Sequence, residues 1–205
     1  SGGITSVETA REFPVRIIES GPTAAVIASQ YYGKLFQIKD MFCFDMGGTT
    51  AKSCLIQKGH AGLVSTFEVG RVQRFKKGSG LPIQVPVVDL MEIGAGGGSI
   101  AKISKMGLLQ VGPASAGADP GPACYGRGGP LAVTDVNFYL GKILPDHFPF
   151  PLDRTATEER LQSLCHEIER ASGQPYTPYE LADGFVRVAN SNMVKAIRTI
   201  SIAKG

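Results

Sequence analysis

The stretch at residues 42–56 constrains the fold most, because two apolar runs there flank the polar turn Asp45-Met46-Gly47-Gly48-Thr49-Thr50. Short apolar runs separated by glycine predict the two strands of a β-hairpin. Glycine tolerates positive φ angles and lets backbone N–H groups come close to an anion. The pattern therefore predicts a hairpin whose tight turn binds phosphate.

Each polar residue of this turn has a role in such a site. Gly47 and Gly48 would supply backbone N–H donors, and Thr49 and Thr50 would add hydroxyl donors. Asp45, at the end of a buried strand, could hold Mg²⁺ directly or through water. The same residues also fit a plain glycine turn with a capping aspartate, so the motif alone leaves both interpretations open.

Composition narrows the class of protein. The 205 residues suffice for one sizeable domain or two small ones. No apolar run is long enough for a membrane-spanning helix, and a net charge of +3 is too balanced to indicate nucleic-acid binding. We therefore expect neither a membrane nor a nucleic acid as partner.

The N-terminal residues and the cysteines indicate the cellular compartment of the protein. The N-terminal residues Ser1-Gly2-Gly3 do not resemble a signal peptide. The cysteines form no CxxC pair and are interpreted as reduced thiols, two of them in buried strands, of a cytoplasmic protein: Cys43, Cys54, Cys124 and Cys165.

Strands are predicted to come first along the chain and helices later. Strands are expected at 13–18, 41–45, 51–57 and 63–69, with a β-rich run at 83–93, an apolar helix at 24–32 and an exposed basic loop at 71–80. Helices are expected at 134–140, from a capping box at Thr155–Glu158 to about Arg170, and after a capping box at Thr177–Glu180. This order indicates a mixed α/β (α+β) fold around one sheet, with a sheet-rich core at 13–142 and a mainly helical part at 143–205.

Further candidates lie in two glycine-rich segments. Gly94-Ala95-Gly96-Gly97-Gly98-Ser99 could bind an anion or form a structural turn, and it lacks the spacing of a dinucleotide fingerprint. The long irregular segment 112–130 is of a length that is often functional. Cys124 within it is interpreted as a packed thiol, since no histidine base lies nearby in sequence. Asp135 is either an acid close to a metal or a helix cap.

Several of these motifs, taken in order, resemble the hydantoinase A / 5-oxoprolinase (N-methylhydantoinase A) family. The matching segments are Glu19-Ser20-Gly21-Pro22, 45–50, 93–101, 111–129 and 132–137, and the resemblance covers most of residues 13–142. The first two also resemble the second lobe of the actin-like ATPase superfamily, in which a Pro-Thr-Ala-Ala helix precedes an Asp-x-Gly-Gly-Thr hairpin. The resemblance implies an actin-like, ribonuclease H-like ATPase lobe with a mixed central sheet and flanking helices.

The resemblance also implies a reaction, the ATP-dependent opening of a cyclic amide such as a hydantoin, 5-oxoproline or a related lactam. Phosphoryl transfer depends on positioning and on charge neutralisation by Mg²⁺ and N–H donors. Asp45 would be the catalytic and metal-binding residue. The ATP-binding residues would be Gly47, Gly48, Thr49 and Thr50 in the turn, and Gly96, Gly97, Gly98 and Ser99 in the second loop.

The chain resembles only part of such an enzyme. The N-terminal lobe of the family, with its own first phosphate loop, is missing, so we expect the chain by itself to bind ATP weakly and not to turn over. Relatives also work with a B-type subunit or domain. Lys52 stands where many members have an acidic residue, and it either contacts phosphate or points to solvent, the latter being favoured.

Two alternative functions remain at this stage. One is a non-catalytic actin-like lobe that serves assembly or regulation, and the other is an acetone carboxylase-type subunit. The motifs from Ile93 to Asn137 favour the cyclic amide hydrolase over the first of these, because actin and chaperone lobes lack them.

Overall fold

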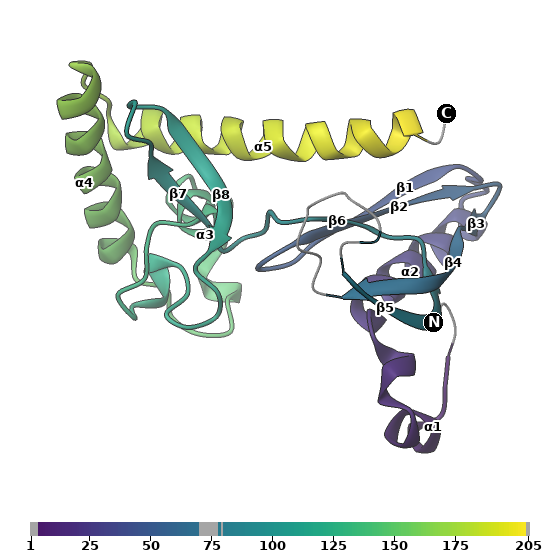
Figure 1. Ribbon diagram of the computed structural model, residues 1–205. Helices are drawn as coiled ribbons and strands as arrows, with labels where there is room; N and C mark the ends of the chain where they lie inside the picture. The colour runs from purple at the N-terminus through teal and green to yellow at the C-terminus, as the bar shows by residue number, and fades with distance from the viewer. Residues whose placement is uncertain (1–3, 70–77, 79, 204–205) are drawn as a thin grey trace. The chain divides into compact units, whose positions relative to one another are not determined.

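The computed structural model describes residues 4–69, 78 and 80–203 of the chain (Figure 1). Of the basic loop predicted at 71–80, only residues 78 and 80 fall within the described part. The chain forms two compact units. The first comprises residues up to Asp45 and Lys52–Glu92, and the second comprises Met46–Ala51 and the chain from Ile93 onward.

The first unit contains the N-terminal helices and most of the strands. The helices are α1 (Val7–Glu12), the 3₁₀-helix η1 (Pro14–Ile17) and α2 (Ser20–Leu35), and the strands are β1 (Met41–Met46), β2 (Ala51–Gln57), β3 (His60–Ala61), β4 (Leu63–Val69), β5 (Leu81–Val88) and β6 (Met91–Ile93). Strands β1, β2 and β3 lie side by side, β6 pairs with β2, and β4 pairs with β5 antiparallel. Val26 of α2 packs on the buried side chains of the strands, which are Cys43, Cys54, Ile56 and Val88.

Helix α2 has one buried face and one exposed apolar face. Thr23, Val26 and Gly33 are buried, and a Cβ atom on Gly33 would lie only 2.8 Å from the carbonyl oxygen of Ile38. Ile27, Tyr31 and Leu35, spaced one helical turn apart, are exposed. The helix therefore meets the core through a narrow stripe of small side chains and leaves its larger side chains uncovered in this chain.

The second unit is a hairpin packed with helices. It contains β7 (Ser99–Ile103), β8 (Leu109–Ser115), the short 3₁₀-helices η2 (Ala123–Tyr125) and η3 (Pro145–His147), and the helices α3 (Val133–Tyr139), α4 (Arg154–Ser172) and α5 (Pro178–Ala203). Strands β7 and β8 are antiparallel, and α5 packs against β8, α3 and α4 (Figure 1). The core is apolar, and its fully buried side chains include Leu161, Leu181, Phe185 and Val136. Among the described residues, no helix is long and apolar enough to cross a bilayer.

The structure confirms the mixed α/β fold and the predicted strands at 41–45, 51–57 and 63–69. The strand predicted at 13–18 is wrong, because this segment contains the 3₁₀-helix η1, and its apolar side chains are exposed with no neighbouring strand. The hairpin β7–β8 was not predicted. The described strands form one four-stranded sheet and two separate pairs rather than a single sheet. Helix α3 packs on α4 and α5 within the second unit. The division of one domain into a sheet-rich core at 13–142 and a mainly helical part at 143–205 stays a prediction.

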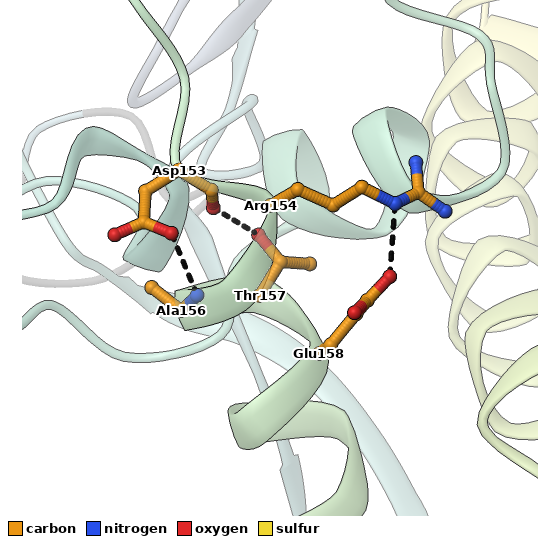
Figure 2. A network of polar contacts seen from close by, with 5 residues as sticks. All are labelled: Asp153, Arg154, Ala156, Thr157 and Glu158. Atoms are coloured by element: carbon orange, nitrogen blue, oxygen red, sulfur yellow. Dashed lines mark hydrogen bonds and ion pairs between the residues drawn. The ribbon is translucent and has the colours of Figure 1, made fainter.

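Helix α4 begins earlier than the sequence predicted (Figure 2). The Asp153 carboxylate accepts a hydrogen bond from the N–H of Ala156 at 2.9 Å, and so it caps the helix. The predicted capping box at Thr155–Glu158 is wrong, because Glu158 instead pairs with the Nε of Arg154 at 2.8 Å. The second predicted capping box is confirmed. Thr177 Oγ1 accepts from Glu180 N at 3.2 Å, and Glu180 Oε2 accepts from Thr177 N at 2.9 Å.

The cap of α4 yields a direct test. We expect Asp153→Ala to lower the free energy of unfolding by about 1 kcal/mol, since it removes the acceptor of the Ala156 N–H in the first helical turn. Thr155→Ala, an exposed position outside the cap, should change it by less than about 0.5 kcal/mol. Urea unfolding of the two variants measures both values. A larger loss of stability in Thr155→Ala than in Asp153→Ala would show that Thr155, and not Asp153, caps the helix.

Candidate functional site

The predicted phosphate turn joins β1 to β2. The N–H of Gly47 donates to the carbonyl oxygen of Thr50 at 2.9 Å and closes the turn. Gly47, Gly48 and Thr49 are exposed, and Thr50 is half-buried.

Neither glycine of the turn is required by the protein's own structure. Neither adopts a positive φ, so the conformational reason that the sequence suggested is wrong. A Cβ atom on Gly48 would meet no atom within 4 Å, and one on Gly47 would meet only the carbonyl oxygen of Thr50, at 3.4 Å. The open space beside Gly48 fits a position at which a ligand approaches the backbone closely.

The second glycine loop holds this turn through its backbone. The N–H of Gly97 donates to the carbonyl oxygen of Gly47 at 3.0 Å, and the N–H of Gly98 donates to that of Gly48 at 2.6 Å. Because a trans peptide is planar, with its C=O and N–H on opposite sides, the N–H groups of Gly48 and Thr49 point away from the glycine loop. In the part of the chain that the structure describes, neither N–H donates a hydrogen bond. The turn therefore presents two free donors on its exposed side.

Close packing explains the three consecutive glycines of the loop. A Cβ on Gly96 would lie 2.6 Å from the carbonyl oxygen of Gly47, and one on Gly98 would lie 2.9 Å from that of Gly48. The N–H of Gly96 donates to Ser99 Oγ at 2.9 Å, and Ser99 is only 1% exposed. The N–H groups of all three glycines thus have acceptors within the protein. Direct contact of Gly96–Gly98 and Ser99 with ATP stays a prediction, and support of the turn is the role that the hydrogen bonds show.

Sequence reasoning missed Thr134 as a member of this site. Its N–H donates to the carbonyl oxygen of Gly97 at 2.8 Å, and its hydroxyl donates to the same oxygen at 2.9 Å. A threonine in the first turn of a predicted helix was a signal for side-chain hydrogen bonding. Only the tertiary structure identifies its acceptor, which lies 37 residues away in the chain.

The charged candidates of the first unit differ in their surroundings. Asp45 lies on β1 and is half-buried, and no described residue forms an ion pair or hydrogen bond with its carboxylate. Lys52 on β2 forms an ion pair with Glu19, and the two side chains are only 16% and 14% exposed. The expectation that Lys52 points to solvent is therefore wrong. Among the described residues, no group of three or more His, Cys, Asp or Glu side chains could hold a metal ion.

Asp135 is a helix cap within the protein rather than an exposed acid. It is completely buried, and its carboxylate accepts hydrogen bonds from the N–H groups of Ala123, Cys124 and Ala132 at 3.0, 2.7 and 2.7 Å. Burial raises the pKa of Asp135 above its ordinary value, although hydrogen bonds from the Cys124 thiol and the three N–H groups act in the opposite direction. The carboxylate anchors the irregular segment before α3 to the start of that helix.

Cys124 is a packed thiol, as the sequence indicated. The residue is fully buried, and burial, followed by the neighbouring Asp135, raises the pKa of its thiol far above the ordinary value. Since the thiolate is the nucleophilic form, this cysteine is unsuited to covalent catalysis.

The fold is a mixed α/β lobe of the actin-like ATPase type, with a glycine turn backed by a second glycine loop. A family model described as hydantoinase/oxoprolinase matches residues 1–205. The chain therefore belongs to the hydantoinase/oxoprolinase family.

Curated relatives match the whole chain. An uncharacterised protein of Methanocaldococcus jannaschii, MJ0964, is 39% identical over 100% of this chain and 30% of its own length. A 5-oxoprolinase of Dictyostelium discoideum is 37% identical over 100% of the chain and 17% of its own length. The caprolactamase subunit alpha of Pseudomonas jessenii is 35% identical over 100% of the chain and 28% of its own length.

Two solved structures are similar as well. A nucleotide-free acetone carboxylase matches with a TM-score of 0.76 and 26% identity, over 100% of this chain and 27% of its own. The ATP-dependent caprolactamase of Pseudomonas jessenii matches with a TM-score of 0.69 and 33% identity, over 91% of this chain and 26% of its own. The chain thus spans less than a third of the length of each of these proteins.

The burial of Cys124 predicts its reactivity. At pH 9 an ordinary cysteine is largely thiolate, whereas Cys124 should stay protonated and inaccessible in the native protein. We expect iodoacetamide to modify it at least about 100-fold more slowly in native than in urea-unfolded protein. Peptide mass spectrometry after timed alkylation measures the rates, and similar rates in both states would show that the thiol is accessible.

Proposed function

We propose that this chain contributes one phosphate-binding loop to the ATP site of an enzyme that hydrolyses cyclic amides of the hydantoin, 5-oxoproline or lactam class. The observation that carries the proposal is the pair of exposed N–H groups of Gly48 and Thr49, which have no acceptor among the described residues. Backbone N–H groups held in this way, beside a glycine without a side chain, suit the oxygens of a phosphate group.

The residues of the turn have distinct roles in this proposal. When bound, ATP and Mg²⁺ would supply the phosphoryl group that activates the amide carbonyl oxygen and the charge that balances it. The N–H groups of Gly48 and Thr49, with the hydroxyls of Thr49 and Thr50, would orient the β- and γ-phosphate oxygens. Asp45 fits as a single carboxylate ligand to Mg²⁺ or its water shell, because this ion keeps several waters and needs few protein ligands.

The relatives favour cyclic amides over the alternatives. The names 5-oxoprolinase and caprolactamase both denote hydrolysis of a cyclic amide. An acetone carboxylase-type subunit is the second candidate, favoured by the TM-score of 0.76. Sequence identity is higher to the caprolactamase structure, 33% against 26%, and supports the first. A non-catalytic actin-like nucleotide-binding lobe with an assembly or regulatory role is the least supported, since the relatives that are named by an activity are enzymes.

The partners that we propose are a cyclic amide, the remainder of the same polypeptide with its N-terminal lobe, and a B-type subunit or domain. Relatives more than three times as long leave ample chain to cover the exposed apolar face of α2. That face presents Ile27, Tyr31 and Leu35, beside Tyr32 stacked on Phe36 with ring centroids 6.3 Å apart. Apolar rows of this kind are usually buried in an interface. The four cysteines are buried thiols, which supports a cytoplasmic location.

Substrate-dependent ADP release by the full-length polypeptide, co-expressed with its B-type partner, tests the function across a panel of hydantoins and lactams. In the active enzyme, Gly48→Ala keeps the N–H but adds a methyl group in the open space that a phosphate would approach. We expect it to raise the KM for MgATP about tenfold, the effect of weakening one hydrogen bond to a charged group. The free energy of unfolding should change by less than about 0.5 kcal/mol, because the added Cβ meets no protein atom.

Gly21→Ala is the matched control for that variant. Gly21 also has a negative φ and open space at its Cβ, but it lies in the first turn of α2. We expect its KM for MgATP to equal that of the wild-type enzyme. No ADP release with any cyclic amide, or equal KM values in both variants and the wild type, would contradict the proposal.

The exposed face of α2 is tested by thiol labelling of the full-length protein. If the remainder of the polypeptide covers this face, a Tyr31→Cys variant should react with a maleimide at least about tenfold more slowly in native than in urea-unfolded protein. The four cysteines of this chain are buried, and labelling of the full-length protein without the substitution gives the background from all natural thiols. Equally fast labelling in both states would show that Tyr31, 65% exposed in this chain, stays uncovered.

A further inference from the structure

Gly97 and Gly98 of the glycine loop each form hydrogen bonds through both the N–H and the carbonyl group. The N–H of Gly97 donates to the carbonyl oxygen of Gly47 in the turn, and its own carbonyl oxygen accepts twice from Thr134. The N–H of Gly98 donates to Gly48, and its own carbonyl oxygen accepts from the N–H of Ala116 at 2.8 Å. The loop is therefore a bridge between the turn and the segments that contain Ala116 and Thr134.

The end of this bridge at Thr134 is firmly anchored. The adjacent Asp135 is completely buried, and its carboxylate binds three backbone N–H groups of the preceding segment. Ala132, two residues before Thr134, pairs with Ile100 in the strand that follows the glycine loop. The start of α3 thus has little freedom to move relative to the loop.

Hydrogen bonds that link successive peptide groups set the directions of these groups, in addition to stabilising the loop. Peptide planarity couples the direction of the Gly47 carbonyl to that of the Gly48 N–H, and that of the Gly48 carbonyl to that of the Thr49 N–H. The two bonds from Thr134 polarise and orient the peptide that joins Gly97 to Gly98, which strengthens the bond that the N–H of Gly98 donates to the carbonyl oxygen of Gly48. Thr134 therefore influences where the free N–H of Thr49 points, although among the described residues it makes no hydrogen bond to the turn itself.

We propose that Thr134 is a positioning residue of the ATP site, acting through the peptide that joins Gly97 to Gly98 on the N–H donor of Thr49. This inference rests on the proposed function and adds a residue that lies outside the predicted phosphate motifs. A merely structural role for Thr134 would affect stability alone. A positioning role affects the turn and the binding of MgATP more than it affects the rest of the unit.

The variants are chosen to separate these two roles in the full-length enzyme. Thr134→Val removes the hydroxyl and keeps the shape and the backbone N–H, whereas Thr134→Ser keeps the hydroxyl and is the conservative rescue. Thr157→Val is the matched control, because the Thr157 hydroxyl also donates to a backbone carbonyl, that of Asp153 at 3.3 Å, but at the start of α4 (Figure 2).

The first readout needs no nucleotide. Hydrogen–deuterium exchange, resolved to single amides by fragmentation, follows the N–H groups of Gly97 and Gly98, with the N–H of Ser104, bonded to Leu108 at 2.8 Å, as a reference. We expect Thr134→Val to speed exchange at Gly98, whose N–H shares a peptide with the Gly97 carbonyl, about three- to tenfold and to leave Ser104 unchanged. Thr134→Ser should recover most of the wild-type protection.

The second readout is the kinetics of ADP release. We expect Thr134→Val to raise the KM for MgATP about three- to tenfold while the KM for the cyclic amide stays at the wild-type value. Thr157→Val should leave both constants unchanged even if it lowers stability.

Wild-type exchange at Gly98 in Thr134→Val, or an unchanged KM for MgATP, would overturn the inference. A rise in the KM for MgATP of the same size in Thr157→Val would overturn it too, since the effect would then be general destabilisation. A wild-type enzyme that releases no ADP with any cyclic amide would instead remove the proposed function. The exchange rates decide separately whether Thr134 holds the turn.

Discussion

Two backbone hydrogen bonds organise the candidate site, from Gly97 to the carbonyl oxygen of Gly47 and from Gly98 to that of Gly48. They fix the carbonyl groups of the turn on one side and, through the planar peptide, its N–H groups on the other. This approach of two backbones is possible only without side chains, because a Cβ on Gly96 or Gly98 would lie under 3.0 Å from turn atoms. The direction of the free donors, and with it the proposed binding of phosphate, depends on this contact.

The buried carboxylate of Asp135 holds the irregular segment before α3 in place. Burying a carboxylate is costly unless hydrogen bonds compensate, and Asp135 is compensated by hydrogen bonds from three backbone N–H groups. The segment thereby holds its shape without a regular ladder of hydrogen bonds, and α3 gains an N-terminal cap. The same arrangement keeps Cys124 buried and protonated, so one interaction both orders the loop and excludes thiolate chemistry there.

Local patterns were predictable where neighbouring residues decide the structure. The hairpin strands β1 and β2 and the capping box at Thr177 follow from apolar runs and from a hydroxyl three residues before a glutamate. The predictions were wrong where a neighbouring residue forms the expected hydrogen bond instead, or where the interacting residue is distant in the sequence. Asp153 caps α4 in place of Thr155, and Lys52 pairs with Glu19, 33 residues away. The 3₁₀-helix η1 replaces a predicted strand because apolar residues form a strand only where another strand offers its hydrogen bonds.

The sequence by itself determined the family, the mixed α/β class and the hairpin with its Asp45–Thr50 turn, because these depend on local composition, periodicity and motif order. Only the tertiary structure decided why the glycines are present. Gly96 and Gly98 are needed for close backbone contact, whereas Gly48 faces open space and has no internal requirement. A glycine in the sequence shows that a side chain is absent. Only the neighbouring atoms in the structure show whether the protein itself fills that space or leaves it open to a ligand. For the same reason Thr134, unremarkable in sequence, was identified only by the distant carbonyl group that it binds.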